Sequence, residues 1–246
     1  MIELDPSKIP QHVAMIMDGN GRWATRQNLH RSEGHKRGAE RVEEIVVTAR
    51  EIGVRYLTLY AFSHENWKRP DSEVTGLMEL LCHFLVAKRE KFLENRIRFR
   101  TIGEVDRLPG AALKELTATM EATSRFDDLT LILALSYGSR QEISQAAEKL
   151  IRKRLSSSNP LAPIEPEEFS QGLQTHGIPD PDLLIRTSGE HRISNFMLWQ
   201  TAYTELYFTD TLWPDFKKDE FLRAIAEYQS RERRFGLTSD QIREFD

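Results

Sequence analysis

Short apolar runs recur along the chain, and longer stretches with apolar residues at helical spacing separate them. A short apolar run between turn residues is typical of a buried strand, and alternation of apolar and polar residues indicates a strand with one exposed face. The segment 97–102 alternates in this way. The pattern predicts six strands, at 13–17, 56–60, 97–102, 129–135, 183–185 and 206–208.

Helical spacing, in which apolar residues recur three or four positions apart, fills the intervals between these strands. It is clear at 39–52, where Gly53 suits a C-terminal cap, and Asp71 or Ser72 is expected to cap a helix that runs to about Asn95. Further helices are predicted at 109–124, 140–155 and 167–172, and from Phe221 into 231–236. Because strands alternate with helices, residues 1–246 are expected to form a single α/β domain with a central, mostly parallel six-stranded sheet flanked by helices.

The helix predicted at 72–95 has an apolar surface that is wider than one core-facing stripe. Its apolar residues include Val74, Leu77, Met78, Leu80, Leu81, Phe84, Leu85 and Val86. Such a helix is either buried on two sides or forms one wall of an apolar cavity. The pattern by itself leaves both interpretations open.

Composition narrows the class of protein. The formal net charge of -4 gives no overall attraction to nucleic acid, so any anion site must be local. Cys82 is the only cysteine, which excludes an internal disulfide and suits a reducing compartment such as the cytoplasm. The acidic, proline-containing start of the chain does not resemble a signal peptide, and no run of about 18 apolar residues is present to span a membrane.

Polar groups follow four of the predicted strands directly. Asp18 comes after the first strand, Asn66 after the second, Tyr137 after the fourth and Arg186 after the fifth. In open α/β sheets, ligands bind beyond the carboxyl ends of the strands. We therefore expect these loops to converge on one site at a single edge of the sheet.

The segment around Asp18 suggests the chemistry of that site. Gly19, Asn20 and Gly21 form a turn that opens a helix, where backbone N–H groups can approach an anion, and Arg22 adds a positive charge. A carboxylate beside such a turn is explained if a divalent cation lies between it and a phosphate. Asp18 could instead only cap the helix. The spacing of Gly19, Gly21 and Ala24 also fits a weak dinucleotide-binding motif, but the next strand lacks the acid that would hold a ribose.

Arginine dominates the remaining charged candidates. Arginine binds phosphate through two parallel hydrogen bonds, and five arginines exceed what one phosphate needs. Ordinary surface ion pairing is the alternative for each. The simplest ligand set is two diphosphates with Mg²⁺ held by two carboxylates. The charged candidates are Asp18, Arg22, Arg31, His35, Arg69, Arg186, Arg192 and Glu205.

Taken in order, these segments strongly resemble the motifs of the cis-prenyltransferases, and among them bacterial undecaprenyl diphosphate synthases. The resemblance covers residues 12 to 236. The departures are small: His64 stands where Ser or Thr is commoner, and 136–139 replaces the commoner Asn-Tyr-Gly-Gly. The matching segments are 17–24, Arg31, 34–35, 62–63, 65–67, 69–70, 185–190, Arg192, 194–195 and 233–236.

The resemblance implies a homodimeric, Mg²⁺-dependent enzyme that adds isopentenyl diphosphate units in cis to an allylic diphosphate such as farnesyl diphosphate. The product would be a long polyprenyl diphosphate, such as undecaprenyl diphosphate for a cell-wall carrier lipid, released to the membrane. It implies a cytoplasmic enzyme that contacts the membrane surface, and no nucleic-acid partner. It also makes the helix 72–95 a wall of a hydrophobic product tunnel, and we expect Leu129, at the start of its strand, to floor that tunnel.

The resemblance also assigns roles to residues. Asp18 and Asn66 would be catalytic, and Asp18 and Glu205 would hold the metal. Arg186, Arg192 and Ser194 would bind isopentenyl diphosphate. The other substrate-binding residues would be Gly19, Asn20, Gly21, Arg22, Trp23, Arg31, His35, Ser63, Glu65, Trp67, Arg69 and Glu73.

Two rival functions remain at this stage. A non-catalytic subunit of the same family should have lost Asp18 or the cluster at Arg186, and this chain keeps both. A nicotinamide-binding enzyme has only the weak glycine spacing in its favour.

Overall fold

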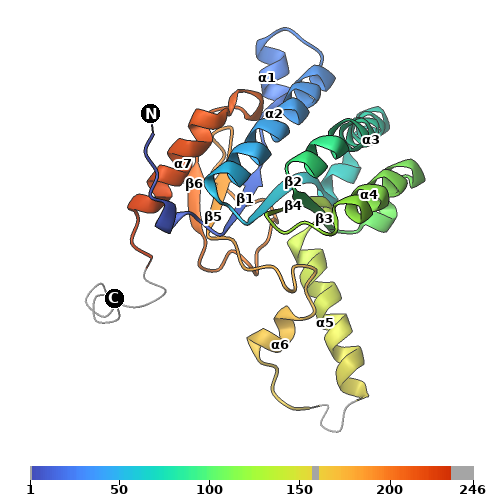
Figure 1. Cartoon of the computed structure of the whole chain (residues 1–246). Coiled ribbons are helices and arrows are strands. Elements are labelled where there is room, and N and C mark those ends of the chain that lie inside the picture. The colour runs from blue at the N-terminus through green and yellow to red at the C-terminus, as the bar shows by residue number, and fades with distance from the viewer. Residues whose placement is uncertain (1, 157–160, 234–246) are drawn as a thin grey trace.

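The computed structural model describes residues 2–156 and 161–233. Its centre is a six-stranded sheet in which every neighbouring pair of strands is parallel (Figure 1). The strand order is β3-β4-β2-β1-β5-β6, so β1 and β2 lie at the centre. The strands are β1 (His12–Ile16), β2 (Tyr56–Ser63), β3 (Ile97–Ile102), β4 (Leu129–Tyr137), β5 (Leu183–Arg186) and β6 (Glu205–Phe208).

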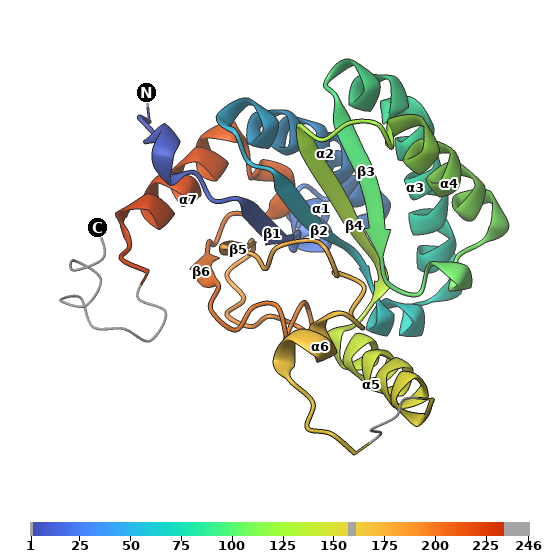
Figure 2. The same cartoon turned by 60° about the horizontal axis from the view of Figure 1, so that its bottom comes forward.

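Helices cover one face of the sheet, and a mixed layer covers the other (Figure 2). The larger core lies under α2, α3, α4 and α7, while Ile178, Phe196 and Met197 of the long segment before β6 pack on the opposite face. The helices are α1 (Asn20–Arg26), α2 (Arg31–Ile52), α3 (Asp71–Glu94), α4 (Gly110–Thr123), α5 (Ser139–Leu155), α6 (Pro166–Ser170) and α7 (Lys218–Ser230). No helix in the described ranges is long and apolar enough to cross a membrane.

The predicted α/β fold and all six predicted strands are confirmed, and the sheet is wholly rather than mostly parallel. Differences concern the ends of elements. β2 and β4 continue to Ser63 and Tyr137 because their ladder runs on through polar residues. α2 starts before the apolar stretch because the His30 side chain accepts a hydrogen bond from the N–H of Ser32.

The expected cap of α3 is wrong. Pro70 is its N-cap residue, and the Pro70 carbonyl accepts hydrogen bonds from the N–H groups of Glu73 and Val74. Asp71 and Ser72 lie in the first turn instead. At the other end of the chain, α7 ends at Ser230, and the predicted continuation through 234–236 lies outside the described residues.

Candidate active site

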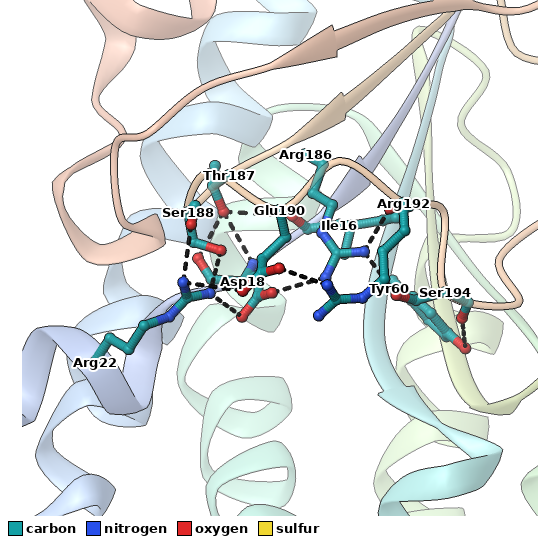
Figure 3. A network of polar contacts seen from close by, with 10 residues as sticks. All are labelled: Ile16, Asp18, Arg22, Tyr60, Arg186, Thr187, Ser188, Glu190, Arg192 and Ser194. Atoms are coloured by element: carbon teal, nitrogen blue, oxygen red, sulfur yellow. Dashed lines mark hydrogen bonds and ion pairs between the residues drawn. The ribbon is translucent and has the colours of Figure 1, made fainter.

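Asp18 lies just beyond the carboxyl end of β1, where its backbone is fixed by the neighbouring strand. The Asp18 N–H donates to Thr187 Oγ1 at 2.9 Å, and that hydroxyl donates to the Asp18 carbonyl at 2.7 Å. The same carbonyl accepts from the N–H of Trp213 at 3.0 Å. With its backbone held in this way, the carboxylate projects from the sheet edge (Figure 3).

Two arginines flank the Asp18 carboxylate. Arg186 Nη2 donates to Asp18 Oδ2 at 2.9 Å, and Arg22 Nη2 lies 3.3 Å from Oδ1. Burial alone would raise the pKa of the Asp18 carboxyl, but the hydrogen bond and charge of Arg186, together with Arg22, hold that pKa below its usual range. Asp18 is therefore ionised near neutral pH.

The loop after β5 holds both arginines in place. Arg186 is almost fully buried and donates through Nη1 to the Ser194 hydroxyl at 2.6 Å and to the carbonyl of Arg192. Arg22 donates to the Ser188 carbonyl at 2.9 Å, and Glu190 accepts from Arg22 and Arg192 (Figure 3). The Arg192 side chain is 61% exposed, so its guanidinium remains available for a ligand from solvent.

Glycines bring the Asp18 turn close to α2. Gly19, the N-cap of α1, has φ +109°, a conformation that favours glycine. A Cβ on Gly34 would lie 2.0 Å from the Asn20 carbonyl oxygen, and a Cβ on Gly38 would lie 2.3 Å from Asn20 Oδ1. Only glycines at these two positions of α2 let the turn approach so closely.

His35 lies one turn into α2, beside a group of charges from α2 and α3. Glu73 accepts from Arg69 at 2.9 Å and is 3.3 Å from Arg31 Nε. Burial, and then the charges of Arg69 and Arg31, lower the pKa of His35 to about 4, and Glu73 only partly opposes them. The imidazole is therefore neutral near pH 7, and its buried Nε2 has no hydrogen-bond partner among the described residues.

The loop after β2 is the 3₁₀ turn η2 (His64–Lys68), and a reciprocal cap fixes its start. The Ser63 side chain accepts from the N–H of Asn66, and Asn66 Oδ1 accepts from the N–H of Ser63 at 3.0 Å. Glu65 accepts from Asn195 Nδ2 at 2.9 Å, which joins this loop to the one after β5. Trp67 donates from Nε1 to the Ser136 hydroxyl at 2.8 Å.

Two hollows meet at Asp18. A shallow one of about 450 Å³ is lined by charged residues and glycines of the α1 turn. A deeper one of about 620 Å³ runs from Asp18 between α2, α3 and β4. The shallow hollow is lined by Asp18, Gly19, Gly21, Arg22, Thr25, Arg26 and Arg31. The deep cavity has polar residues at its mouth, including Asn20, His35, Ser63, Glu65, Asn66, Arg69 and Ser194, and apolar residues further in, including Ala39, Val42, Leu77, Leu81, Phe84, Leu133 and Leu135.

The helix α3 therefore lines a cavity, which resolves the two interpretations of its wide apolar surface. Leu133 and Leu135 share one face of β4 with Leu129 and Leu131. The latter two are fully buried and are not part of the cavity lining. The cavity thus ends short of Leu129, the residue expected to form its floor.

Glu205 is not brought to Asp18. It is the first residue of β6 and pairs in register with Leu183, which pairs with Val13. Asp18 lies five residues beyond Val13, or about 16 Å along parallel strands. The Glu205 carboxylate pairs with Arg231 at 2.9 Å. The prediction that one ion is shared by Asp18 and Glu205 within this chain is therefore wrong, because the two carboxylates lie toward opposite ends of the strands.

A metal held by one carboxylate and a substrate remains compatible with the donor set. Within the described ranges, no three His, Cys, Asp or Glu side chains form a cluster that could hold an ion. Mg²⁺ is usually held by one or two carboxylates and phosphate oxygens rather than by an all-protein cage. The ionised, partly exposed Asp18 fits that role.

Other predicted and unpredicted residues complete the site. Trp23 donates from its indole to Asp215 at 3.0 Å and does not line the cavities described above. Sequence reasoning missed Thr187 and Asn195, which hold the backbone of Asp18 and the side chain of Glu65. Their position directly after Arg186 and Ser194 was the available signal, but the partners of both are distant in sequence.

These features define a parallel α/β protein with an arginine-rich anion site at the mouth of a deep apolar cavity. A family model described as "Putative undecaprenyl diphosphate synthase" matches residues 16–236. The chain belongs to this family of isoprenyl transferases.

Curated relatives and solved structures agree with this membership. An isoprenyl transferase of Thermotoga maritima is 51% identical over 93% of this chain and 97% of its own, and one of Aquifex aeolicus is 49% identical over 95% and 99%. Lavandulyl diphosphate synthase from Lavandula x intermedia, solved in complex with dimethylallyl diphosphate, has a TM-score of 0.90 at 36% identity, covering 94% of this chain and 99% of that one. A probable undecaprenyl diphosphate synthase from Campylobacter jejuni has a TM-score of 0.77 at 37% identity, covering 92% and 98%.

Proposed function

We propose that this isoprenyl transferase condenses isopentenyl diphosphate units in cis onto farnesyl diphosphate to make undecaprenyl diphosphate, a cell-wall carrier lipid precursor. One observation carries the proposal: Asp18 lies where a cationic hollow meets a deep apolar cavity. A substrate with a diphosphate head and a hydrocarbon tail matches both surfaces at once. The likeness to an enzyme solved with dimethylallyl diphosphate, an allylic diphosphate, supports the same assignment.

The two substrates would occupy different groups of arginines. The allylic diphosphate would lie in the shallow hollow against Gly19, Gly21, Arg22 and Arg31, with its tail entering the cavity beneath α3. Isopentenyl diphosphate would be held by the exposed Arg192, beside Arg186 and Ser194.

These residues would act chiefly by orientation and charge. Departure of the allylic diphosphate leaves negative charge on its oxygens, and preorganised guanidinium groups stabilise that charge. Arg22 and Arg186 are already oriented by Ser188, Ser194 and Asp18, so they need little reorganisation during the reaction. Holding two substrates with their reacting carbons in line removes much of the entropic barrier to the condensation.

The family implies Mg²⁺, and Asp18 would hold it together with diphosphate oxygens. The ion would supply further stabilisation of the departing diphosphate. A neutral His35 beside the cavity mouth would contribute a hydrogen bond rather than a charge, because its pKa is about 4.

We further propose that the enzyme is a cytoplasmic homodimer that releases its product to the membrane and has no nucleic-acid partner. The arm formed by α5 and α6 extends away from the sheet (Figure 1). On α5, Ile151 is 57% exposed and Leu155 is 76% exposed. Large apolar side chains on such an arm favour contact with a second copy.

The test is incubation of the protein with radiolabelled isopentenyl diphosphate, farnesyl diphosphate and Mg²⁺, followed by chromatography of the extracted lipid. Labelled polyprenyl product is expected from the wild type, at a length that also settles the chain length. Asp18→Ala should abolish turnover while the fold is kept, since loss of the metal contact costs several kcal/mol of barrier. Near-normal turnover of that variant in saturating Mg²⁺ would remove Asp18 from the metal site, and an inactive wild type would favour a non-catalytic subunit.

A further inference from the structure

Glu104 joins three separate elements beside the cavity without lining it. It follows β3 and precedes the 3₁₀ turn η3 (Val105–Arg107). Glu104 Oε2 accepts from Arg107 Nη1 at 3.0 Å and lies 3.2 Å from Nδ1 of His64, the first residue of η2. Its other oxygen, Oε1, accepts from Gln145 Nε2 of α5 at 2.8 Å.

The same group of side chains also holds Trp67. The guanidinium carbon of Arg107 lies 5.1 Å from the centre of the Trp67 ring, a distance at which cation and ring attract each other. The edge of Phe62 meets the ring from another side, and Ser136 accepts from the indole N–H. Glu104 therefore positions both ends of the contact to η2: it binds His64 directly and orients the arginine that covers Trp67.

This polar anchoring matters because η2 has little else to fix it. None of its five residues is buried, and its fold is a single 3₁₀ turn. A segment with few buried apolar contacts opens at low free energy unless side-chain bonds hold it. The segment nevertheless carries Glu65 and Asn66, which line the mouth of the cavity.

We propose that Glu104 is a positioning residue for the η2 loop, acting through His64 and Arg107 to hold Asn66 and Trp67 at the reacting end of the substrate cavity. The proposal deepens the proposed function and rests on it for the activity readout. Glu104 itself touches neither hollow, so its removal should disturb the geometry of the loop rather than the anion site.

The experiment compares Glu104→Ala with Asp128→Ala. Asp128 is a matched control, because it is a similarly exposed carboxylate that accepts from Arg50 and Arg96 but lies just before β4, at the opposite edge of the sheet. Loss of charge-assisted bonds should speed hydrogen exchange of the amides at 64–69 by about tenfold or more in Glu104→Ala. In the same variant kcat should fall by about tenfold or more, while KM for either diphosphate changes by less than about threefold.

Glu104→Gln provides the rescue arm, because its amide keeps the shape and an acceptor for Arg107. It should recover much of the exchange protection and of kcat, whereas Asp128→Ala should match the wild type in both. Unchanged loop exchange in Glu104→Ala would overturn the proposal, as would a kcat equal to that of Asp128→Ala. If the wild type made no product, the proposed function would fail, and the exchange data alone would decide whether Glu104 orders the loop.

Discussion

Replacing Gly34 by alanine tests how the Asp18 turn is positioned. The added Cβ would lie 2.0 Å from the Asn20 carbonyl oxygen and 2.8 Å from its carbon, whereas ordinary contact begins at 3.4 Å. The obstacle is backbone, so α1 must move away from α2 by more than an ångström. That movement would displace the turn between Gly19 and Arg22, which forms the shallow anion hollow.

The magnitude follows from two opposing effects. Overpacking of a tight contact costs about 1–3 kcal/mol, and alanine in a helix interior gains roughly 1 kcal/mol over glycine. Gly76, inside α3, is the matched control, since a Cβ there meets nothing within 4 Å. The helix-propensity gain is common to both variants, so Gly34→Ala should be less stable than Gly76→Ala by about 1–3 kcal/mol.

Urea unfolding of both variants measures this difference, and steady-state kinetics measures its effect on the site. Gly34→Ala should also raise KM for the allylic diphosphate, whereas Gly76→Ala should leave that KM unchanged. A Gly34→Ala protein as stable as Gly76→Ala, with an unaltered KM, would refute the close approach of α1 and α2.

Three other predictions concern the second substrate, product length and pH. Arg192→Ala should raise KM for isopentenyl diphosphate more than KM for the allylic substrate, and equal changes in the two constants would contradict the assignment of separate sites; Arg186→Ala should affect both, because Arg186 also binds Asp18. Leu129→Ala should lengthen the products without changing the first condensation, at a stability cost of about 2–5 kcal/mol, and an unchanged length profile on chromatography would show that Leu129 does not limit the chain. His12 and His35 have pKa values lowered to about 4, so the unfolded chain binds more protons than the folded one between pH 4 and 6.5; the free energy of unfolding should therefore fall as pH is lowered through this window, and a flat profile in denaturant titrations would count against two buried neutral histidines.

Local sequence pattern was sufficient for the elements and for most of the cavity mouth. Apolar runs at 13–17 and 183–185 can be buried only as strands, and the polar residues after them must then gather at one edge of a parallel sheet. Asp18, Arg22 and Arg186 could therefore be grouped in advance, and the structure brings them within 3.3 Å of one another.

Register could not be read in the same way. The run at 206–208 predicts a strand, but its alignment with β5 depends on packing of the whole segment between them, not on its own pattern. In the structure this register places Glu205 at the end of the sheet opposite Asp18 and beside Arg231. The two carboxylates could thus be recognised as candidates in the sequence while their separation could not.

The sequence by itself determined the strands, the helices and the edge of the sheet at which the chemistry gathers, because periodicity and turn residues act over a few neighbouring positions. Only the tertiary structure decided what depends on contacts between distant segments. These are the approach of Asn20 to Gly34, the end of the cavity at Leu133 and the anchoring of His64 by Glu104. Each is a matter of an ångström or two between side chains far apart in the chain, and no local pattern encodes such distances.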